Sequence, residues 1–253
     1  MKKFDFINNS FHFSIDDVFE FLIEISDKKI PIKKHYFFKS LYNLWKKYKI
    51  KTGLHIFYEG IINNKLRTLK EVRIIKNEIK EGWIYFGAHA LNVNTPPYSQ
   101  KPQEQKKFIN NTYKEISRFA GKKFLSKRIR LHHYSETYEI SKFLRNKKIY
   151  GLFSTDRKVG AHRLPKKFSK QLIEKGLLVY NKLQFIKTDY RIEFLINNSK
   201  KKIINKFFKT LKQKKFIIIY SHEYEFKKKV IINTLNKIMD TLTNRLKLKN
   251  IRP

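Results

Sequence analysis

Residues 11–18, with the sequence FHFSIDDV, carry the strongest structural signal in this 253-residue chain. The short apolar-rich run 11–16 predicts a buried β-strand. Two consecutive carboxylates, Asp16 and Asp17, stand at its end, and the pattern of an amphipathic helix continues to about residue 26. The segment therefore predicts a strand that delivers two acidic side chains to the edge of a sheet.

The same unit recurs along the chain: a short apolar run, polar residues, and then a longer amphipathic stretch. Strands are predicted at residues 53–58, 83–89, 128–133, 148–153 and 216–220, with extended chain at 177–187. Helices are predicted at residues 37–48, 66–81, 103–120 and 230–248. This alternation predicts an α/β fold in which helices cover a parallel sheet. Because no repeat or Gly/Ser-rich linker marks a boundary, we expect one domain over residues 1–253, with its core at about 10–226 and a C-terminal helix at about 230–248.

The composition excludes several classes of protein. The chain has no cysteine, which rules out disulfides, zinc-thiolate sites and thiol nucleophiles. Hydrophobic residues make up 41%, which is typical of a globular protein. The first residues, MKKFDFINNSFHFSIDD, do not resemble a signal peptide, and no stretch approaches the ~20 apolar residues of a membrane span. We therefore expect a cytoplasmic protein.

The formal net charge of +36 suggests an anionic partner. However, the excess is mostly Lys, is scattered along the chain, and accompanies abundant Ile, Asn, Phe and Tyr, the residue set that an AT-rich coding sequence favours. Nucleic-acid readers use clustered Arg, interleaved aromatic residues or a known module, and the sequence shows none of these. We interpret the charge as a solvated Lys-rich surface without a specific nucleic-acid site. Attraction to an acidic polysaccharide, a nucleotide-sugar or an anionic membrane stays open.

Polar side chains stand at the ends of several predicted strands in turn. Because chemistry gathers at the carboxyl ends of the strands in α/β folds, we expect these side chains to meet. They are Asp16 and Asp17, His89, His132 and His133, Asp156 and Arg157, and His222 and Glu223. A single His at a strand end is more often structural than catalytic, but repeated strand ends of this kind favour a site.

Two adjacent carboxylates raise each other's pKa, and a divalent metal compensates their charge. One Asp can bind the metal while the other acts as a base, and His ligands from other strands leave a position open for water. Such a site hydrolyses amides or esters, because the metal acidifies water and polarises a carbonyl. The sequence contains no Gly-rich phosphate loop, GxSxG elbow, HExxH or dinucleotide motif.

At these motifs the chain resembles the polysaccharide deacetylase (NodB-homology) family. The run FSIDDV at residues 13–18 is similar to the family's first motif, which implies that Asp16 is the catalytic base and Asp17 a metal ligand. The strand WIYFGAH at residues 83–89 is similar to the one that carries the second motif, and its His89 then binds metal.

Two further motifs extend the resemblance. RIRLHH at residues 128–133 is similar to the third motif, where Arg130 helps to set the aspartates. IIYSHE at residues 218–223 is similar to the last motif, which implies that His222 is the general acid. The resemblance implies a distorted (β/α) barrel of about seven strands, a divalent metal, most often Zn²⁺, and N-deacetylation of a sugar.

The chain departs from the family at two positions. The second His of the second motif is replaced by Val93, and the Gly after the Asp pair by Val18. We assign the missing ligand to His132, which alternates onto the same face as Arg130, with His133 as the second choice. Taken together, the motifs are most similar to the divergent WbmS-type branch, found with O-antigen and capsule biosynthesis clusters.

Other polar residues are given lesser roles. We expect substrate contacts from Asp156, Arg157, His133 and Glu223, although a surface ion pair explains Asp156 and Arg157 equally well. The alternating run TDYRIE at residues 188–193 favours a structural salt-bridge ladder over a site. Four His without a motif are interpreted as structural: His12, His35, His55 and His162.

The sequence therefore predicts a metal-dependent carbohydrate deacetylase that acts on a nucleotide- or lipid-linked sugar in surface polysaccharide biosynthesis. A relative that binds sugar without turnover, and a Lys-rich nucleic-acid-binding protein, are the alternatives. The sugar, the metal and the oligomeric state stay open.

Overall fold

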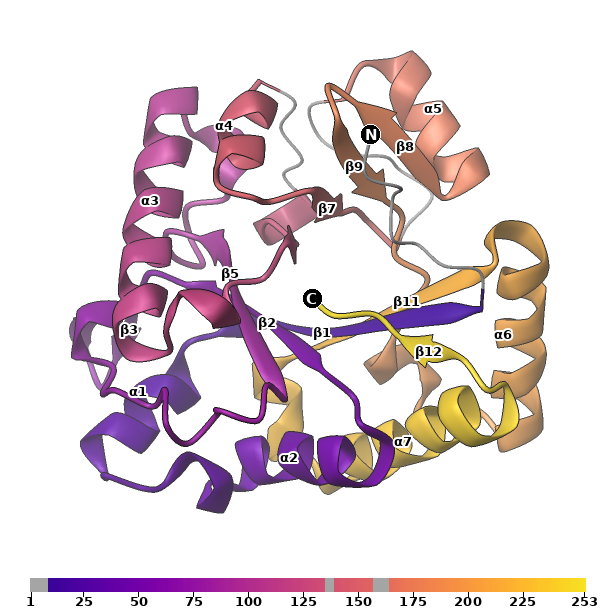
Figure 1. The fold of residues 1–253 in the computed structure, drawn as a ribbon, viewed down its shortest axis with the longest axis horizontal. Helices are drawn as coiled ribbons and strands as arrows, with labels where there is room; N and C mark the ends of the chain where they lie inside the picture. The colour runs from indigo at the N-terminus through magenta and orange to yellow at the C-terminus, as the bar shows by residue number, and fades with distance from the viewer. Residues whose placement is uncertain (1–8, 135–138, 157–163) are drawn as a thin grey trace.

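The central strand of the fold is β1 (Ser10–Val18). In the computed structural model, which describes residues 9–134, 139–156 and 164–253, β1 belongs to a sheet with the order β10-β11-β1-β2-β5, parallel throughout (Figure 1). Its other members are β2 (Thr52–Phe57), β5 (Ile84–Ala90), β10 (Tyr190–Arg191) and β11 (Phe216–His222). A short strand, β12 (Lys249–Asn250), pairs with the start of β1.

The side chains of β1 alternate between two environments. On one side, apolar residues join the large hydrophobic core shared with the helices: Phe11, Phe13 and Ile15. On the other side, Ser14 and Asp16 bond to Arg130 across the barrel, and His12 stacks on Phe153 with ring centroids 4.3 Å apart. The period-two pattern of β1 thus places its apolar side chains against the helices and its polar side chains inside the barrel.

A second sheet with the order β6-β7-β9-β8 completes the barrel. Its strands are β6 (Arg128–Ile129), β7 (Gly151–Phe153), β8 (Leu177–Tyr180) and β9 (Leu183–Ile186). A bridge between Phe86 and Leu125 joins the two sheets on one side, and the chain runs from β9 into β10 on the other. A Cβ at Gly87 would lie 2.5 Å from the side chain of Ile129, so glycine permits this close approach. Seven parallel strand positions form the barrel: β11, β1, β2, β5, β6, β7 and the β9–β10 segment. This confirms the predicted α/β barrel of about seven strands.

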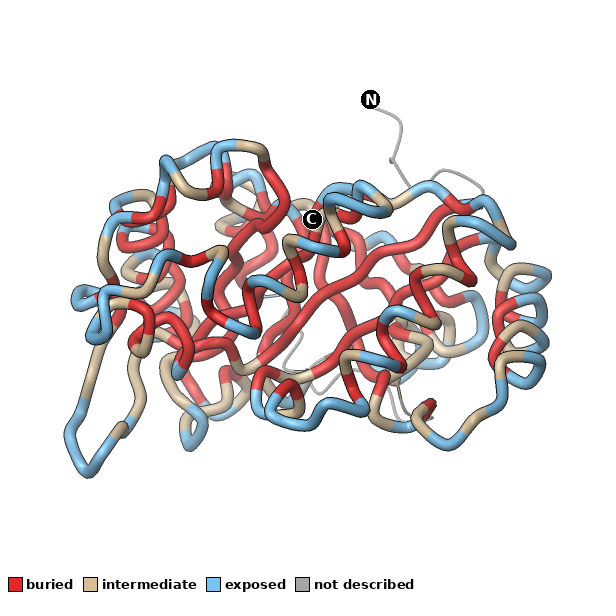
Figure 2. Tube along the Cα trace, turned by 90° about the horizontal axis from the view of Figure 1, so that it is seen from below, coloured by how far each residue is buried: buried red, intermediate tan, exposed pale blue. Residues whose placement is uncertain are grey.

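Seven helices of the described chain surround the strands (Figure 1). They are α1 (Glu20–Asp27), α2 (Tyr36–Tyr48), α3 (Pro102–Phe119), α4 (Ser141–Asn146), α5 (Lys166–Lys175), α6 (Lys200–Lys214) and α7 (Lys229–Asp240). The strands β1, β2, β5 and β11 are buried and the outer faces of the helices are exposed (Figure 2). Within the described residues, no helix has the length and apolar character to cross a membrane.

One predicted helix, residues 66–81, is wrong. The chain there leaves a hairpin of β3 (Glu59–Ile62) and β4 (Lys65–Thr68), makes a 3₁₀ turn at Leu69–Glu71 and continues irregularly. The apolar residues that suggested helical spacing are nevertheless buried: Leu69, Val72, Ile75 and Ile79. Asn63 and Asn64 both have positive φ, which matches a tight two-residue hairpin turn.

Two other predictions need smaller corrections. The strand predicted at residues 128–133 pairs only over β6, because His133 takes a left-handed φ of 53° and turns the chain. The helix predicted at residues 230–248 ends at Asp240 and continues as a π-helical turn, Thr241–Arg245. Both changes occur where a local turn interrupts an otherwise regular apolar pattern.

Candidate metal centre and active site

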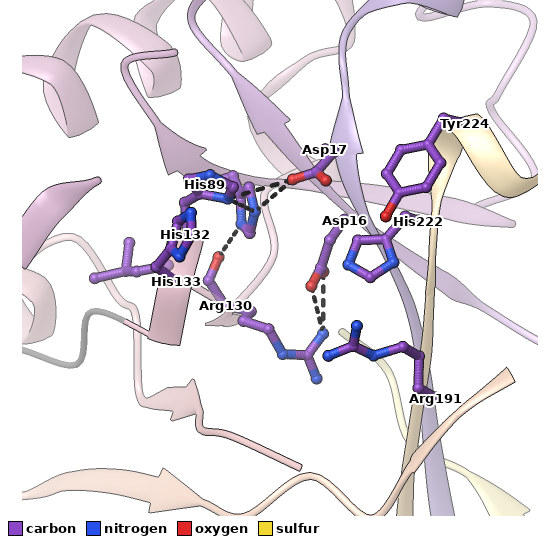
Figure 3. Close-up of a pocket in the computed structure, with 10 residues that line it drawn as sticks. Asp16, Asp17, His89, Arg130, His132, His133, Arg191, His222 and Tyr224 are labelled. Carbon is purple, nitrogen blue, oxygen red and sulfur yellow. Dashed lines mark hydrogen bonds and ion pairs between the residues drawn. The ribbon is translucent and has the colours of Figure 1, made fainter. Parts of the chain in front are cut away.

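A pocket lies at the carboxyl ends of β1, β5, β6 and β11 (Figure 3). Its lining consists of Asp16, Asp17, His89, Arg130, Leu131, His132, His133, Arg191, His222 and Tyr224. The strand-end reasoning named six of these residues and the motif resemblance added Arg130. Parallel packing brings them together because all the strands end at one edge of the barrel.

A backbone irregularity allows two consecutive carboxylates to enter one pocket. In a regular strand Asp16 and Asp17 would point to opposite faces. Here the β1–β2 register shifts between Ile15 and Val18, and Asp17 has a left-handed φ of 60°. Asp is among the few residue types that tolerate this conformation. The bulge thus turns Asp17 back toward the pocket that Asp16 already faces (Figure 3).

Three side chains converge tightly enough to hold a metal ion: Asp17, His89 and His132. Oδ1 of Asp17 lies 3.0 Å from Nε2 of His89 and 3.4 Å from Nδ1 of His132. The two ring nitrogens are 3.1 Å apart. Burial raises the pKa of Asp17, but the two imidazoles outweigh burial and hold that pKa well below its usual range. The carboxylate is therefore ionised and able to bind a cation.

The tautomer of His89 supports a cation at this point. Its Nδ1 lies 2.6 Å from the carbonyl oxygen of Arg130. Because a carbonyl only accepts, Nδ1 carries the proton, and the lone pair of Nε2 in the neutral ring faces Asp17 and His132. Three electron-rich atoms in contact repel one another unless a cation, either a metal ion or the proton of an imidazolium, lies among them. Tetrahedral zinc with bonds of about 2.0–2.1 Å separates its ligands by roughly 3.3 Å, which is close to the spacing here.

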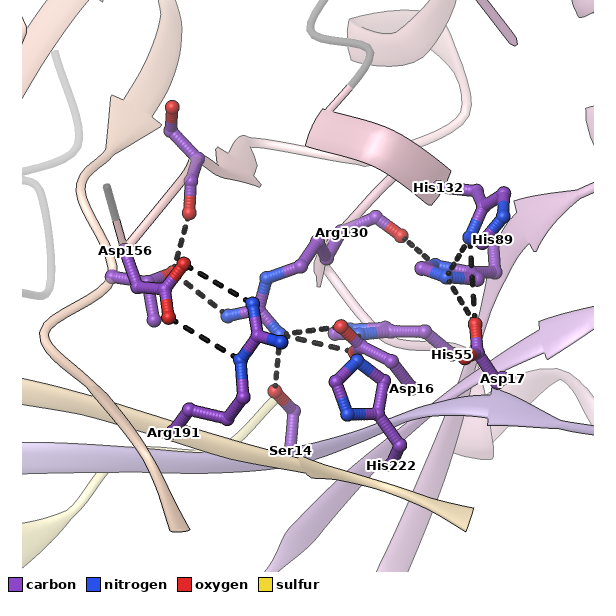
Figure 4. Close-up of polar contacts among 12 residues, drawn as sticks. Ser14, Asp16, Asp17, His55, His89, Arg130, His132, Asp156, Arg191 and His222 are labelled. Atoms are coloured by element: carbon purple, nitrogen blue, oxygen red, sulfur yellow. Dashed lines mark hydrogen bonds and ion pairs between the residues drawn. The ribbon is translucent and has the colours of Figure 1, made fainter. Parts of the chain in front are cut away.

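Asp16, which is only 2% exposed, is held by two donors (Figure 4). The guanidinium of Arg130 donates to both of its oxygens at 3.0 Å, and Nδ1 of His55 lies 2.7 Å from Oδ1. Arg130 also donates to Ser14 and Thr188, so its own orientation is fixed. Burial raises the pKa of Asp16, but Arg130 and His55 together hold that pKa far below its usual range.

His222 lies on β11 directly beside Asp16, its register partner across the two parallel strands. Its Nδ1 lies 2.7 Å from Oε1 of Glu193, which also accepts the backbone N–H of His222 at 3.1 Å. Burial lowers the pKa of His222. The hydrogen bond to Glu193 and the nearby negative charges of Asp16 and Asp17 raise this pKa by a larger amount, so that it lies above its ordinary value. Tyr224 stacks on the imidazole with ring centroids 5.2 Å apart. These contacts favour the protonated form of the imidazole at the pocket wall.

Arg191 enters the pocket from β10, and Asp156 orients it (Figure 4). Nε and one terminal nitrogen of Arg191 each lie 3.3 Å from an oxygen of Asp156. Asp156 itself does not line the pocket. Substrate contact, which the sequence suggested for Asp156, is therefore better placed on Arg191.

The other predicted substrate residues have different positions. His133 lies at the exposed rim, with its ring centroid 4.3 Å from that of His132. Glu223, expected to contact substrate, instead points to the start of α1, where its carboxylate accepts the backbone N–H groups of residues 19–21 at 3.0–3.2 Å. Burial raises the pKa of Glu223 to about 8. Arg157 lies outside the described residues, and Val93 is 57% exposed and away from the pocket lining.

Sequence reasoning missed His55 and Glu193, which bond to Asp16 and His222, and three residues of the pocket lining: Leu131, Arg191 and Tyr224. His55 was interpreted as structural, although it lies within the predicted strand at residues 53–58, which pairs with the strand that carries Asp16. Glu193 and Arg191 belong to the alternating run at 188–193, where a ladder was favoured. The alternation, which suggested one shared face for Asp189, Arg191 and Glu193, was the available signal. Arg191 lines the pocket and Glu193 bonds to His222, whereas Asp189 pairs with Lys214 instead.

Comparison with known proteins gives similarity of structure only. No family model and no curated protein matches the chain. The structure is similar to Bc1960, a peptidoglycan N-acetylglucosamine deacetylase, with a TM-score of 0.54 and 13% identity over 97% of this chain and 86% of that one. It is also similar to a mutant of the CE4 family pseudoenzyme BA3943 with restored activity, with a TM-score of 0.55 and 11% identity over 96% of this chain and 65% of that one.

A third similar structure is the 4-alpha-glucanotransferase from Thermococcus litoralis, with a TM-score of 0.57 and 13% identity over 96% of this chain and 37% of that one. At such identities the likeness shows the fold alone. The fold is the distorted α/β barrel of the CE4 polysaccharide deacetylases, as the motif resemblance predicted. Because one barrel of this kind belongs to a glucanotransferase, the chemistry must be argued from the site.

Proposed function

We propose that the protein is a metal-dependent hydrolase that removes an N-acetyl group from a sugar. The supporting observation is the convergence, in one pocket, of three metal-competent ligands, a carboxylate held by Arg130, and an imidazole whose pKa is raised. These are the parts that amide hydrolysis requires, since an amide needs both an activated water and a proton for its leaving nitrogen.

Asp17, His89 and His132 would hold the metal, which we propose to be zinc. When bound, a divalent cation lowers the pKa of a coordinated water and polarises the carbonyl of the substrate. Asp16, the residue next to the ligand Asp17, accepts the proton of the attacking water. His222, whose protonated form Glu193 favours, donates its proton to the departing nitrogen. Arg130 and His55 act through Asp16 by fixing its orientation.

The substrate that we propose is a nucleotide- or lipid-linked precursor of a surface polysaccharide such as O-antigen or capsule, modified in the cytoplasm. The motif resemblance to the WbmS-type branch supports this choice. Arg191, held in the pocket by Asp156, adds a cationic group that suits an anionic part of such a precursor.

A sugar-binding protein without turnover is the second candidate, because one of the similar structures is a pseudoenzyme with activity restored by mutation. The position of the missing second-motif His, Val93, is exposed and cannot bind the metal. His132 takes the ligand place instead, which is why we favour the enzyme.

Metal analysis and acetate release test the proposal together. We expect one zinc per chain, with loss of zinc in His89→Ala and His132→Ala. The matched control is His133→Ala, an adjacent rim His outside the ligand group, which should keep its zinc. Acetate release from N-acetylated sugar precursors should follow zinc content and fall in Asp16→Asn with zinc retained. Zinc held by His133, or turnover that is the same in Asp16→Asn, would contradict the assignment; bound zinc and sugar without turnover would favour the second candidate.

A further inference from the structure

The helix α6 carries an unusual concentration of positive charge. Its sequence, KKKIINKFFKTLKQK, has seven Lys and no acid, and α5, KKFSKQLIEK, has four Lys and one Glu, a net +10 over 25 residues. The other five helices carry a net +5 over 57 residues. A uniform compositional bias does not explain this difference, because the positive charge of the helices is concentrated on α5 and α6.

The two helices lie on one side of the barrel (Figure 1). The Gly176 that ends α5 packs against Lys214 of α6, and Lys214 donates to the carbonyl of Lys187, whose N–H donates to Gly176. The C-terminal ends of α5 and α6 are therefore held together. Charge on α5 consequently adds to that on α6.

The exposed face of α6 is what we call the lysine face: Lys201, Lys202, Phe208, Lys209 and Lys212. None of these four lysines forms an ion pair with a described residue. The ion pairs of α6 use two other lysines, Lys200 with Asp240 and Lys214 with Asp189. The positive charge of the lysine face is therefore not neutralised within the described molecule.

The lysine face also carries an exposed aromatic ring, that of Phe208. It is 50% exposed and lies four residues before Lys212 and seven after Lys201, in the middle of the lysine face. The opposite side of α6 already provides the buried contacts: Ile203, Phe207 and Thr210. The core does not use the exposed ring of Phe208, which leaves a large apolar side chain among cations at the surface.

We propose that the lysine face of α6 docks on an anionic lipid membrane, with the ring of Phe208 in the interface and the lysines at the head groups. A basic helix with an apolar side chain on its exposed side is suited to this environment. A nucleic-acid surface is less well supported, because readers of base edges and phosphates favour Arg and grooves with stacked aromatics. The lysine face is a convex helix surface without Arg. The proposal does not depend on catalysis.

Vesicle co-sedimentation tests this docking. The probes are phosphatidylcholine vesicles with and without about a third of phosphatidylglycerol, at physiological ionic strength. We expect the full chain to bind only the anionic vesicles. Reversing three charges with Lys201→Glu, Lys209→Glu and Lys212→Glu should weaken partitioning by more than about 100-fold, since each Lys near an anionic surface contributes about 1 kcal/mol. The single variant Phe208→Ser should weaken it by about fivefold with the charge unchanged.

The matched control places the same change in net charge on the opposite side of the barrel: Lys107→Glu, Lys114→Glu and Lys122→Glu, which are also exposed lysines. We expect this control to weaken binding by less than about threefold. Equal loss in the control, or no binding of the full chain to anionic vesicles, would overturn the proposal. Binding to a short DNA duplex that is tighter than to vesicles, lost in the α6 variant and unchanged in Phe208→Ser, would show a nucleic-acid surface instead.

Discussion

Replacement of His55 tests whether this residue, which the sequence motifs did not single out, positions the catalytic base. Because Asp16 is ionised, its Oδ1 accepts the hydrogen bond from Nδ1 of His55 at 2.7 Å. Burial lowers the pKa of His55, which favours the neutral ring. Its buried Nε2 has no hydrogen-bond partner among the residues that the structure describes. His55→Leu removes a hydrogen bond to a charged group, worth about 1.5–3 kcal/mol, and also an unpaired polar atom, whose burial costs about 1–3 kcal/mol.

The loss of the hydrogen bond and the removal of the unpaired atom have opposite and similar effects on the unfolding free energy, whereas only the lost hydrogen bond affects catalysis. The unfolding free energy of His55→Leu should change by less than about 2 kcal/mol, or roughly 4–8 °C in melting temperature. Asp16, however, loses one of the two groups that orient it, so we expect kcat to fall by about 10- to 100-fold with zinc content unchanged. His55→Asn should restore most of this rate, because the amide nitrogen of Asn takes the place of Nδ1 and can donate to Oδ1.

Acetate release, zinc content and thermal melting would be measured on each variant. His12→Leu is the control, since His12 is a buried His of the same barrel interior that makes no hydrogen bond to Asp16. It should affect melting alone. The reasoning would be refuted if His55→Leu kept the wild-type kcat, or if His55→Asn were as slow as His55→Leu.

Four further predictions follow from the site. EDTA should lower the melting temperature of the wild type but not of His132→Ala, since a ligand at about 100 times its Kd adds about 2.7 kcal/mol; an equal shift in both would exclude His132 as a ligand. Glu193→Gln should move the basic limb of the kcat–pH profile to lower pH, because Glu193 raises the pKa of His222; an unmoved limb would exclude His222 as the acid. Burial raises the pKa of Glu223 from 4.5 to about 8. The stability that this group contributes is therefore fully present below pH 4.5 and is lost as the pH rises through 8. Glu223→Gln should flatten the pH dependence of the unfolding free energy, measured by urea denaturation, between these two pH values. Arg130→Met should lower the unfolding free energy by about 3–5 kcal/mol, because it leaves the buried charge of Asp16 unpaired, and adding Asp16→Asn should recover part of the loss; a purely additive double variant would contradict the pairing.

The sequence was sufficient for the alternation of strands and helices, and hence for a parallel sheet covered by helices, because short apolar runs and amphipathic stretches have different periods. The closed barrel was predicted from the motif resemblance. It was not sufficient over residues 66–81. The four apolar residues there are buried as predicted, but helical spacing and an irregular chain beside a hairpin bury such residues equally well. Local pattern reports which side chains are inside, and the backbone path between them depends on turns such as Asn63–Asn64.

The sequence by itself also determined the edge of the barrel at which the polar residues meet, since parallel strands all end at the same edge. Which of these residues touch was decided only by the tertiary structure. The bulge at Asp17 turns two neighbours into one pocket, and the pairing of β1 with β11 sets Asp16 beside His222 across more than 200 residues of chain. The same packing gives Asp16 its partner His55 and directs Glu223 to α1 rather than to substrate. Such contacts depend on which strands become neighbours, and local sequence carries no record of that choice.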